Sequence, residues 1–259
     1  MKEQKSVIGT LTNRSFRRNK GRNLVAVLAI LLTTMMFTTL FTLAQSMGQN
    51  MEEMYLRQAG TTAHATTKQI TDEEIEQIAS HPDVVRYGKS IVVGLAENEQ
   101  LSGRQVEIRY ANDQYAKDDF AYPTTGKMPE SKDEIALDTL TIERLGLSRE
   151  LGQTVTLEWK KDLTSSEVTS STFTLCGWWE GNLSVYASMA WVSEDFALEA
   201  CDHVSIPVDG QICGLRMMGI TFSDNKNIDE KKAVVLEVCG LKNIEFSADM
   251  TYTAEMQQS

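Results

Sequence analysis

Residues 24–43 read LVAVLAILLTTMMFTTLFTL and carry no charge, and the basic segment FRRNKGR precedes them at residues 16–22. At about 1.5 Å per residue, a helix of this length spans the roughly 30 Å hydrocarbon core of a bilayer. Threonine hydroxyls can bond back to helix carbonyls, so the threonines of the run can face lipid or another helix. The sequence therefore predicts one transmembrane helix at residues 24–43.

Basic residues set the orientation of this helix. Arg17, Arg18, Lys20 and Arg22 place the N-terminus in the cytoplasm by the positive-inside rule. We interpret residues 1–23 as a cytoplasmic, basic and interfacial segment, and we expect the rest of the chain outside the cytoplasm. A cleaved secretory signal is the alternative, although its apolar region usually has about 7–15 residues after a short basic segment.

The charge of the chain is divided unevenly along its length. Residues 1–43 carry seven Lys or Arg against one Glu, a charge of +6, so the remainder carries −17 to give the overall −11. An acidic body repels nucleic-acid phosphates, so we expect no nucleic-acid partner. The lipid bilayer is the partner that the N-terminal part predicts.

Helical periodicity continues beyond the span. Met47, Met51, Met54 and Tyr55 follow one another at spacings of four, three and one, so we expect a helical stalk over residues 44–60 that ends at Gly60. Helix packing is the common reason for such methionines, ahead of ligand binding.

Two β-α-β units lie near the ends of the remaining chain. In residues 61–97, Thr71 and Glu74 form a capping-box pattern before a short helix, with a strand on either side. In residues 213–255 a strand, a helix stopping at Gly240 and another strand follow one another. We predict an α+β fold in which these units are two halves of one split α/β subdomain.

The residues between the halves, 98–212, predict a mostly β insertion. Strand-like runs alternate there with Gly, Asn and Ser turns, and one helix begins at Asp138 and stops at Gly146. The polar stretch at 160–172 predicts a hairpin loop. Trp178 and Trp179 are adjacent, and neighbours in a strand point to opposite faces. We therefore predict that one of them contacts a partner, unless the strand is covered on both sides.

Motifs of catalysis are missing from the sequence. It contains no phosphate-binding GxxxxGK[ST] loop, no GxSxG and no HExxH. We expect neither catalytic residues nor a cofactor or metal in this chain. The four cysteines, Cys176, Cys201, Cys213 and Cys239, all lie on the predicted outer side, where they permit two disulfides in three pairings or a set of buried free thiols.

Two segments carry a family resemblance. SFRRNKGRNLVAVLAILLTTMMFTTLFTL, at 15–43, resembles the opening of FtsX-like permeases of ABC transporters, in which a basic N-K-G-R patch precedes the first membrane helix. TGKMPESKDEIALDTLTIERLGLSRELGQTVTL, at 125–157, resembles the MacB-like periplasmic core domain in its G-x-x-P turn, its D-E-I-A-L strand and its L-G-Q-x-V-x-L segment. HPDVVRYG at 81–88 and FTLCGWWEG at 173–181 resemble strands of the same domain.

The resemblance implies a permease subunit in the cell membrane. It implies an extracytoplasmic domain with a porter-like, split ferredoxin-like subdomain, three further membrane helices, a separate ABC ATPase, and a dimer or pseudo-dimer with another permease half. No further apolar span follows TYTAEMQQS at 251–259, so we expect either a piece of a permease or a single-span relative. The alternative function is a membrane-anchored extracellular binding or adaptor protein without transport.

Overall fold

The computed structural model describes residues 19–161, 166–183, 185–204, 207, 211–224, 226–238, 240 and 245–248. Contacts divide the chain into two compact units, Met1–Met54 and Tyr55–Ser259.

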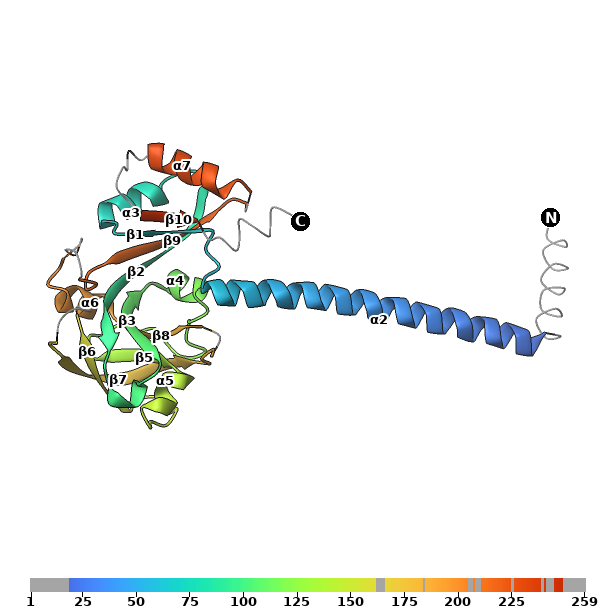
Figure 1. The fold of residues 1–259 in the computed structure, drawn as a ribbon, viewed down its shortest axis with the longest axis horizontal. Coiled ribbons are helices and arrows are strands. Elements are labelled where there is room, and N and C mark those ends of the chain that lie inside the picture. Colours follow the sequence, from blue (N-terminus) through green and yellow to red (C-terminus); the bar gives the residue numbers. More distant parts are fainter. Residues whose placement is uncertain are drawn as a thin grey trace, which may run out of the picture. The chain divides into compact units, whose positions relative to one another are not determined.

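The first unit contains most of helix α2, Lys20–Ala59 (Figure 1). Its segment Lys20–Met47 has a mean hydropathy of 2.3 and is, within the described residues, the one helix long and apolar enough to cross a membrane. The threonines of the span donate their hydroxyls to carbonyls four residues earlier, as Thr34 does to Ile30 and Thr39 to Met35, both at 2.8 Å. These polar groups are thus satisfied inside the helix, as a lipid environment requires.

The second unit is built on one ten-stranded sheet. Its strands are β1 Ala65–Lys68, β2 Val84–Ala96, β3 Gln105–Ala111, β4 Thr125–Gly126, β5 Glu134–Asp138, β6 Thr154–Lys160, β7 Thr169–Trp179, β8 Ala187–Val192, β9 Arg216–Phe222 and β10 Glu245–Ala248. The main order is β10-β1-β9-β2-β3-β8-β5-β7-β4, and β6 pairs with both β2 and β7. The predicted α+β class is therefore confirmed.

The two β-α-β halves come together in the strand order β10-β1-β9-β2, with every pair antiparallel. Helices α3, Asp72–Ala79, and α7, Ile228–Val238, cover the same face of these strands (Figure 1). Ile75 and Ile78 of α3 and Val235 of α7 share a buried core with strand residues such as Met218 and Ile220. This is a ferredoxin-like arrangement split between its second and third strands, as expected.

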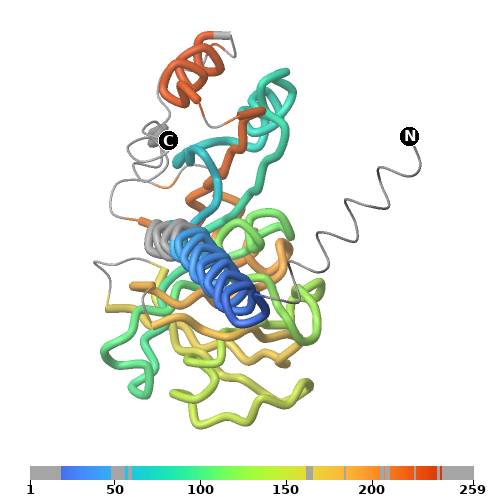
Figure 2. The backbone as a smooth tube through the Cα atoms, turned by 90° about the vertical axis from the view of Figure 1, so that its right-hand side faces the viewer, coloured from blue at the N-terminus to red at the C-terminus, as the bar shows by residue number. Residues whose placement is uncertain are grey.

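The strands of residues 98–212 close with the second part of β2 into a six-stranded barrel. The pairings run β2-β3-β8-β5-β7-β6 and return to β2 through Leu95 with Lys160 and Ala96 with Trp159. At this closure, a Cβ on Gly94 would lie 2.3 Å from the carbonyl oxygen of Lys160, so only glycine fits. Figure 2 shows these residues, green to orange, at one end of the unit and α7, red, at the other.

Alternating residues fill the barrel, as the pleat of its strands requires. The interior set includes Ile91, Val106, Ile135, Leu157 and Phe173, all at most 3% exposed. A second set lies on the outer side of the same strands and includes Val92, Ala136, Trp179 and Trp191. The barrel wall is thus apolar on both faces at these strands.

The expectation of one helix in the insertion was wrong. The described residues contain α4, Asp113–Asp118, α5, Thr139–Arg144, and α6, Glu194–Ala200, with a 3-10 turn at Glu99–Leu101. Asn112, Asp138 and Ser193 cap the three α-helices with their side chains. Helices of six or seven residues are too short for a clear 3.6-residue pattern, so only α5, with both stop and start signals, was predicted.

Candidate coupling site at the base of the stalk helix

Helix α2 ends where the sequence predicted. Ala59 is its last residue, and Gly60 follows with φ of +87°, a conformation that favours glycine. The amide of Gly60 still donates to the carbonyl of Leu56 at 2.9 Å. The chain therefore leaves the helix at Gly60, and the next residues must hold its end in place.

Thr62 makes that attachment to a buried carboxylate. Its amide donates to the carbonyl of Asp118 at 2.8 Å, and its hydroxyl donates to Oδ1 of the same residue at 2.7 Å. Arg86 of β2 donates to this Oδ1 as well, at 2.9 Å. Asp118 is only 5% exposed, and hydrogen bonds to a buried charge are stronger than neutral ones. Asp118 thus joins the end of the stalk to the longest strand of the sheet.

The residues after Asp118 complete the attachment. Phe120 has φ of +55°, which is uncommon for a residue with a side chain, and the Arg57 guanidinium lies 4.8 Å from the centre of its ring. Ala121 accepts a 2.7 Å hydrogen bond from the indole of Trp191. We call Arg57, Thr61, Thr62, Asp118, Asp119 and Phe120 the stalk-base cluster.

Asp119 of the stalk-base cluster has a raised pKa. Burial raises its pKa to about 7, while the Arg109 guanidinium and a hydrogen bond from Thr61 act in the opposite direction. Asp118 and Glu107 add negative charge nearby and raise the pKa further. Arg109 itself forms an ion pair with Glu107. The charge on the stalk base therefore changes near neutral pH.

A small cavity of about 90 Å³ lies beside the stalk-base cluster. Arg57, Asp119 and Phe120 line one part of it, and Arg104 and Trp179 line another. Trp179 stacks on Trp191 with ring centres 6.2 Å apart. The aromatic residues of the outer barrel wall therefore support the segment that receives the stalk.

The structure separates the other site residues predicted from the sequence. Arg17 and Arg18 lie outside the described residues, whereas Lys20 and Arg22 are exposed in the first turn of α2. Trp179 is 5% exposed and packs on the outer barrel wall. Trp178 is half-buried against the barrel interior, and Arg149 lies 5.9 Å from its ring. The strand is thus covered on both faces, which is the exception stated for the predicted partner contact, and packing alone accounts for both tryptophans.

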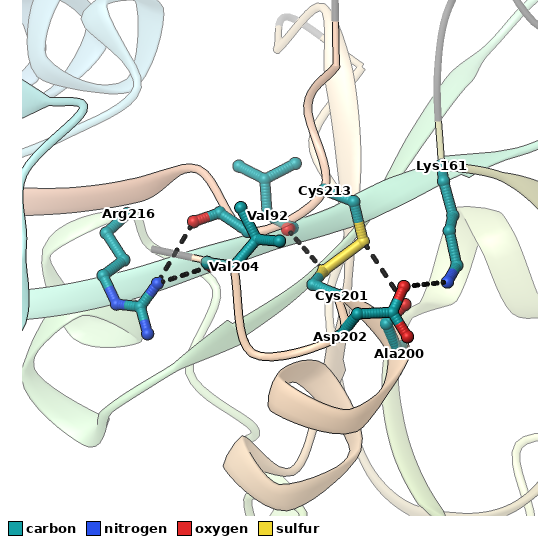
Figure 3. The surroundings of a disulfide bond; sticks show 9 residues. Val92, Lys161, Ala200, Cys201, Asp202, Val204, Cys213 and Arg216 are labelled. Atoms are coloured by element: carbon teal, nitrogen blue, oxygen red, sulfur yellow. Dashed lines mark hydrogen bonds and ion pairs between the residues drawn. A yellow bond between two sulfur atoms is a disulfide. The ribbon is translucent and has the colours of Figure 1, made fainter. Parts of the chain in front are cut away.

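One disulfide joins the barrel to the ferredoxin-like half. Cys201, at the end of α6, is bonded to Cys213, three residues before β9, and Figure 3 shows this bond. Arg216 donates to the carbonyl of Val204 at 2.9 Å and contacts the Asp72 carboxylate of α3 at 3.2 Å. The bond therefore fixes the segment that returns from the barrel. Disulfides are typical of proteins outside the reducing cytoplasm.

Cys176 and Cys239 are the two cysteines outside this disulfide. Cys176 is a half-buried free thiol, and burial raises its pKa to about 12, so it stays protonated. Cys239 lies outside the described residues. The structure thus has a single disulfide among its described residues, where the sequence allowed either two or none.

The stalk-base cluster was missed by sequence reasoning. In a chain this acidic, the pattern KDDF at residues 117–120 does not differ from a solvated surface segment, yet Asp118 is buried. One signal could have found it. Asn112 follows a predicted strand and is a good N-cap, so residues 113–118 could have been predicted as a short helix with one buried face.

Comparisons with known proteins give structural likeness only. No protein-family model matches the chain, and no curated protein sequence matches it. The periplasmic region of MacB from Actinobacillus actinomycetemcomitans is similar at 12% identity and a TM-score of 0.46, over 77% of this chain and 95% of that one. The extracellular domain of the ABC-type transporter YknZ from Gram-positive bacteria has 11% identity and a TM-score of 0.44, over 69% and 88%. At these values the function of the chain has to follow from its own residues.

Proposed function

We propose that the chain is the N-terminal part of the permease subunit of an ABC transporter of the FtsX/MacB type. In this proposal α2 couples a separate ATPase in the cytoplasm to the domain outside the membrane. The subunit lies in the cell membrane with its N-terminus inside and works as a dimer or pseudo-dimer with another permease half.

The observation that carries the proposal is the shared contact at Asp118. A helix can transmit a displacement only if its end is fixed to the body that moves. Gly60 alone would act as a swivel, because its φ of +87° interrupts the helix. The two hydrogen bonds of Thr62 to Asp118, and the ion pair of Asp118 with Arg86 at 2.9 Å, fix that end to β2. A movement of α2 along its axis would therefore load the sheet.

The membrane end supplies the other requirement of coupling. The apolar segment Lys20–Met47 belongs to the same continuous helix as the residues that reach Ala59. Motion of membrane helices, driven by closure of an ATPase dimer, would thus reach Gly60 without an intervening loop. The chain has no phosphate-binding GxxxxGK[ST] loop, so ATP hydrolysis belongs to the partner subunit in this proposal.

Co-purification and a distance measurement test the proposal together. The full-length membrane protein is purified with the ABC ATPase encoded beside it and reconstituted in nanodiscs. Spin labels at exposed positions of the outer domain of the two permease halves then report distances with and without ATP. We expect the ATPase to co-purify and ATP to change the distance distribution.

Two matched variants separate coupling from assembly. Asp118→Ala removes the contact with Thr62 and Arg86, and we expect it to reduce the ATP-dependent distance change while the ATPase is still recovered. Asp113→Ala lies on the same helix, with its side chain 60% exposed, and should keep the full change. If no ATPase co-purified, the proposal of a transporter subunit would be refuted. If Asp118→Ala showed the full ATP-dependent distance change, the role of the stalk-base cluster would be refuted.

A further inference from the structure

The loop between β7 and β8 is held by one arginine. Arg104, just before β3, donates from Nε to the hydroxyl of Ser188 at 2.6 Å. Its two terminal nitrogens donate to the carbonyls of Val185 at 3.3 Å and Asn182 at 3.2 Å. Three contacts from one planar guanidinium fix the loop backbone at both ends. Arg104 therefore fixes the position of this loop on the barrel.

This loop exposes two large apolar side chains. Leu183 is 78% exposed and Tyr186 is 84% exposed, the highest values for large apolar residues in the described part of Tyr55–Ser259. Single exposed apolar residues are common and need no explanation, but here two lie on one anchored loop. Arg104 thus holds the backbone of the loop that carries both exposed side chains.

A groove of about 820 Å³ lies beside the loop. The connection from Ala96 to Gln105 forms one wall, and Leu183, Val185 and Tyr186 contribute to another. Its volume falls within the range of about 300–1,000 Å³ that is common for ligand sites. Arg104 and Val185 also line the cavity at the stalk base, so the two spaces share a wall.

The lining of the groove carries two arginines and two glutamates. Arg144 is exposed and donates to the carbonyl of Ser102 at 3.0 Å, and Arg104 contacts only carbonyls and a hydroxyl. Neither has a carboxylate partner among the described residues. Of the acidic residues in the lining, Glu97 pairs with Lys160 at 3.1 Å, which leaves Glu99. With Glu97 paired to Lys160, the remaining Arg104, Arg144 and Glu99 give the groove one excess positive charge, which suits a carboxylate.

We propose that this groove binds an extended peptide segment of a partner protein, in which a carboxylate lies next to large apolar side chains. The carboxylate would pair with Arg144, and the apolar side chains would pack on Leu183 and Tyr186. Tyrosine and arginine are among the side chains enriched at protein interfaces. The surface goes beyond the coupling function, and it would exist equally in an adaptor protein without transport.

Selection of displayed peptides on the full chain tests this proposal. The protein of residues 1–259 in nanodiscs is presented to a library of random dodecapeptides, with counter-selection on the Leu183→Ser, Tyr186→Ser double variant. Enriched peptides are synthesised, and their binding is measured by fluorescence anisotropy. We expect enriched sequences with Asp or Glu beside Leu, Phe, Tyr or Trp.

Surface variants decide whether the groove is the site. Arg144→Gln and the Leu183→Ser, Tyr186→Ser double variant should each weaken binding by about tenfold or more. Lys226→Gln and Val234→Ser remove a charge and an apolar group from the ferredoxin-like half and should leave binding unchanged. Both altered sites are exposed, and melting temperature confirms folding of each variant.

Three outcomes would overturn the proposal. The selection could yield no peptide that distinguishes the wild type from the double variant. The enriched peptides could be apolar without a carboxylate, as adhesion to a lipid-like surface would give. Finally, Arg144→Gln could bind them as tightly as the wild type. Failure of the coupling experiment would leave this result unaffected, because peptide binding is measured without ATPase.

Discussion

Removal of the Cys201–Cys213 disulfide should destabilise the outer domain by a predictable amount. The bond closes a loop with a sequence separation of 12 residues. In the chain-entropy model, a cross-link over about 15 residues removes unfolded-state entropy worth about 3 kcal/mol at 25 °C. In a domain of about 200 residues, each kcal/mol shifts the melting temperature by about 2–4 °C. Reduction should therefore lower it by about 6–12 °C.

The folded state should lose little when the disulfide is absent. Arg216 is 3% exposed and still holds the carbonyls of Val204 and Gly214, so the segment returning from the barrel keeps its native position. Both Cys201 and Cys213 are buried, and serine fits their volume. The expected change thus lies in the unfolded chain, as the entropy model assumes.

Thermal unfolding with and without reductant measures the effect. Near-UV circular dichroism of the full chain in detergent follows the tryptophans, all of which lie in the barrel strands. We expect dithiothreitol to lower the melting temperature of the wild type and to leave the Cys201→Ser, Cys213→Ser double variant unchanged. Cys176→Ser is the control and should behave as the wild type. An unchanged wild-type melting temperature, with reduction proven by peptide mapping, would refute the reasoning.

Substitutions at Asp119, Arg216 and Thr71 should change the stability of the outer domain in different ways. Burial raises the pKa of Asp119 from 3.8 to about 7, so the folded state binds its proton more tightly and this group's contribution to stability falls as pH rises from about 4 to 7. Urea unfolding should show Asp119→Asn gaining stability over the wild type across that range, and a pH-independent difference would contradict this. Arg216→Met should cost about 1–3 kcal/mol in urea unfolding, whereas Asp72→Ala, at a side chain 62% exposed, should cost about 1 kcal/mol or less. Thr71→Ala removes the capping box of α3 and should cost about 1 kcal/mol by the same measurement, and an equal cost for exposed Ser80→Ala would argue against a capping effect.

Local signals in the sequence predicted the elements whose ends they mark. Thr71 with Glu74, Asp138 and Gly60 each satisfy backbone groups within a few residues, so they act in the same way whatever surrounds them. The union of the two β-α-β units in one subdomain was also predicted, because units separated in sequence have few ways to share one sheet, whereas their strand order comes from the structure.

Long-range closure could not be predicted in the same way. The barrel depends on Gly94 of β2 meeting Lys160 of β6, a contact between residues far apart in sequence that no periodicity encodes. The burial of Asp118 depends likewise on Thr62 and Arg86 arriving from two other elements. From sequence alone, a carboxylate in an acidic chain is assigned to the surface, since most such residues are there.

The two proposed sites meet at one part of the sheet. Arg86 lies near the start of β2, which pairs with β9 up to Ile91 and with β3 from Ser90 to Leu95. β3 begins one residue after Arg104, and its first residue, Gln105, pairs with Ala187 at the end of the exposed loop. A path of contacts is not coupling by itself, because transmission needs an element with two states. Because the groove and the stalk-base cavity share a wall at Arg104, this two-state element can be tested. A peptide bound in the groove should change the ATP-dependent distances of the outer domain. Arg144→Gln should abolish the effect of the peptide, whereas ATP without peptide should still change the distances.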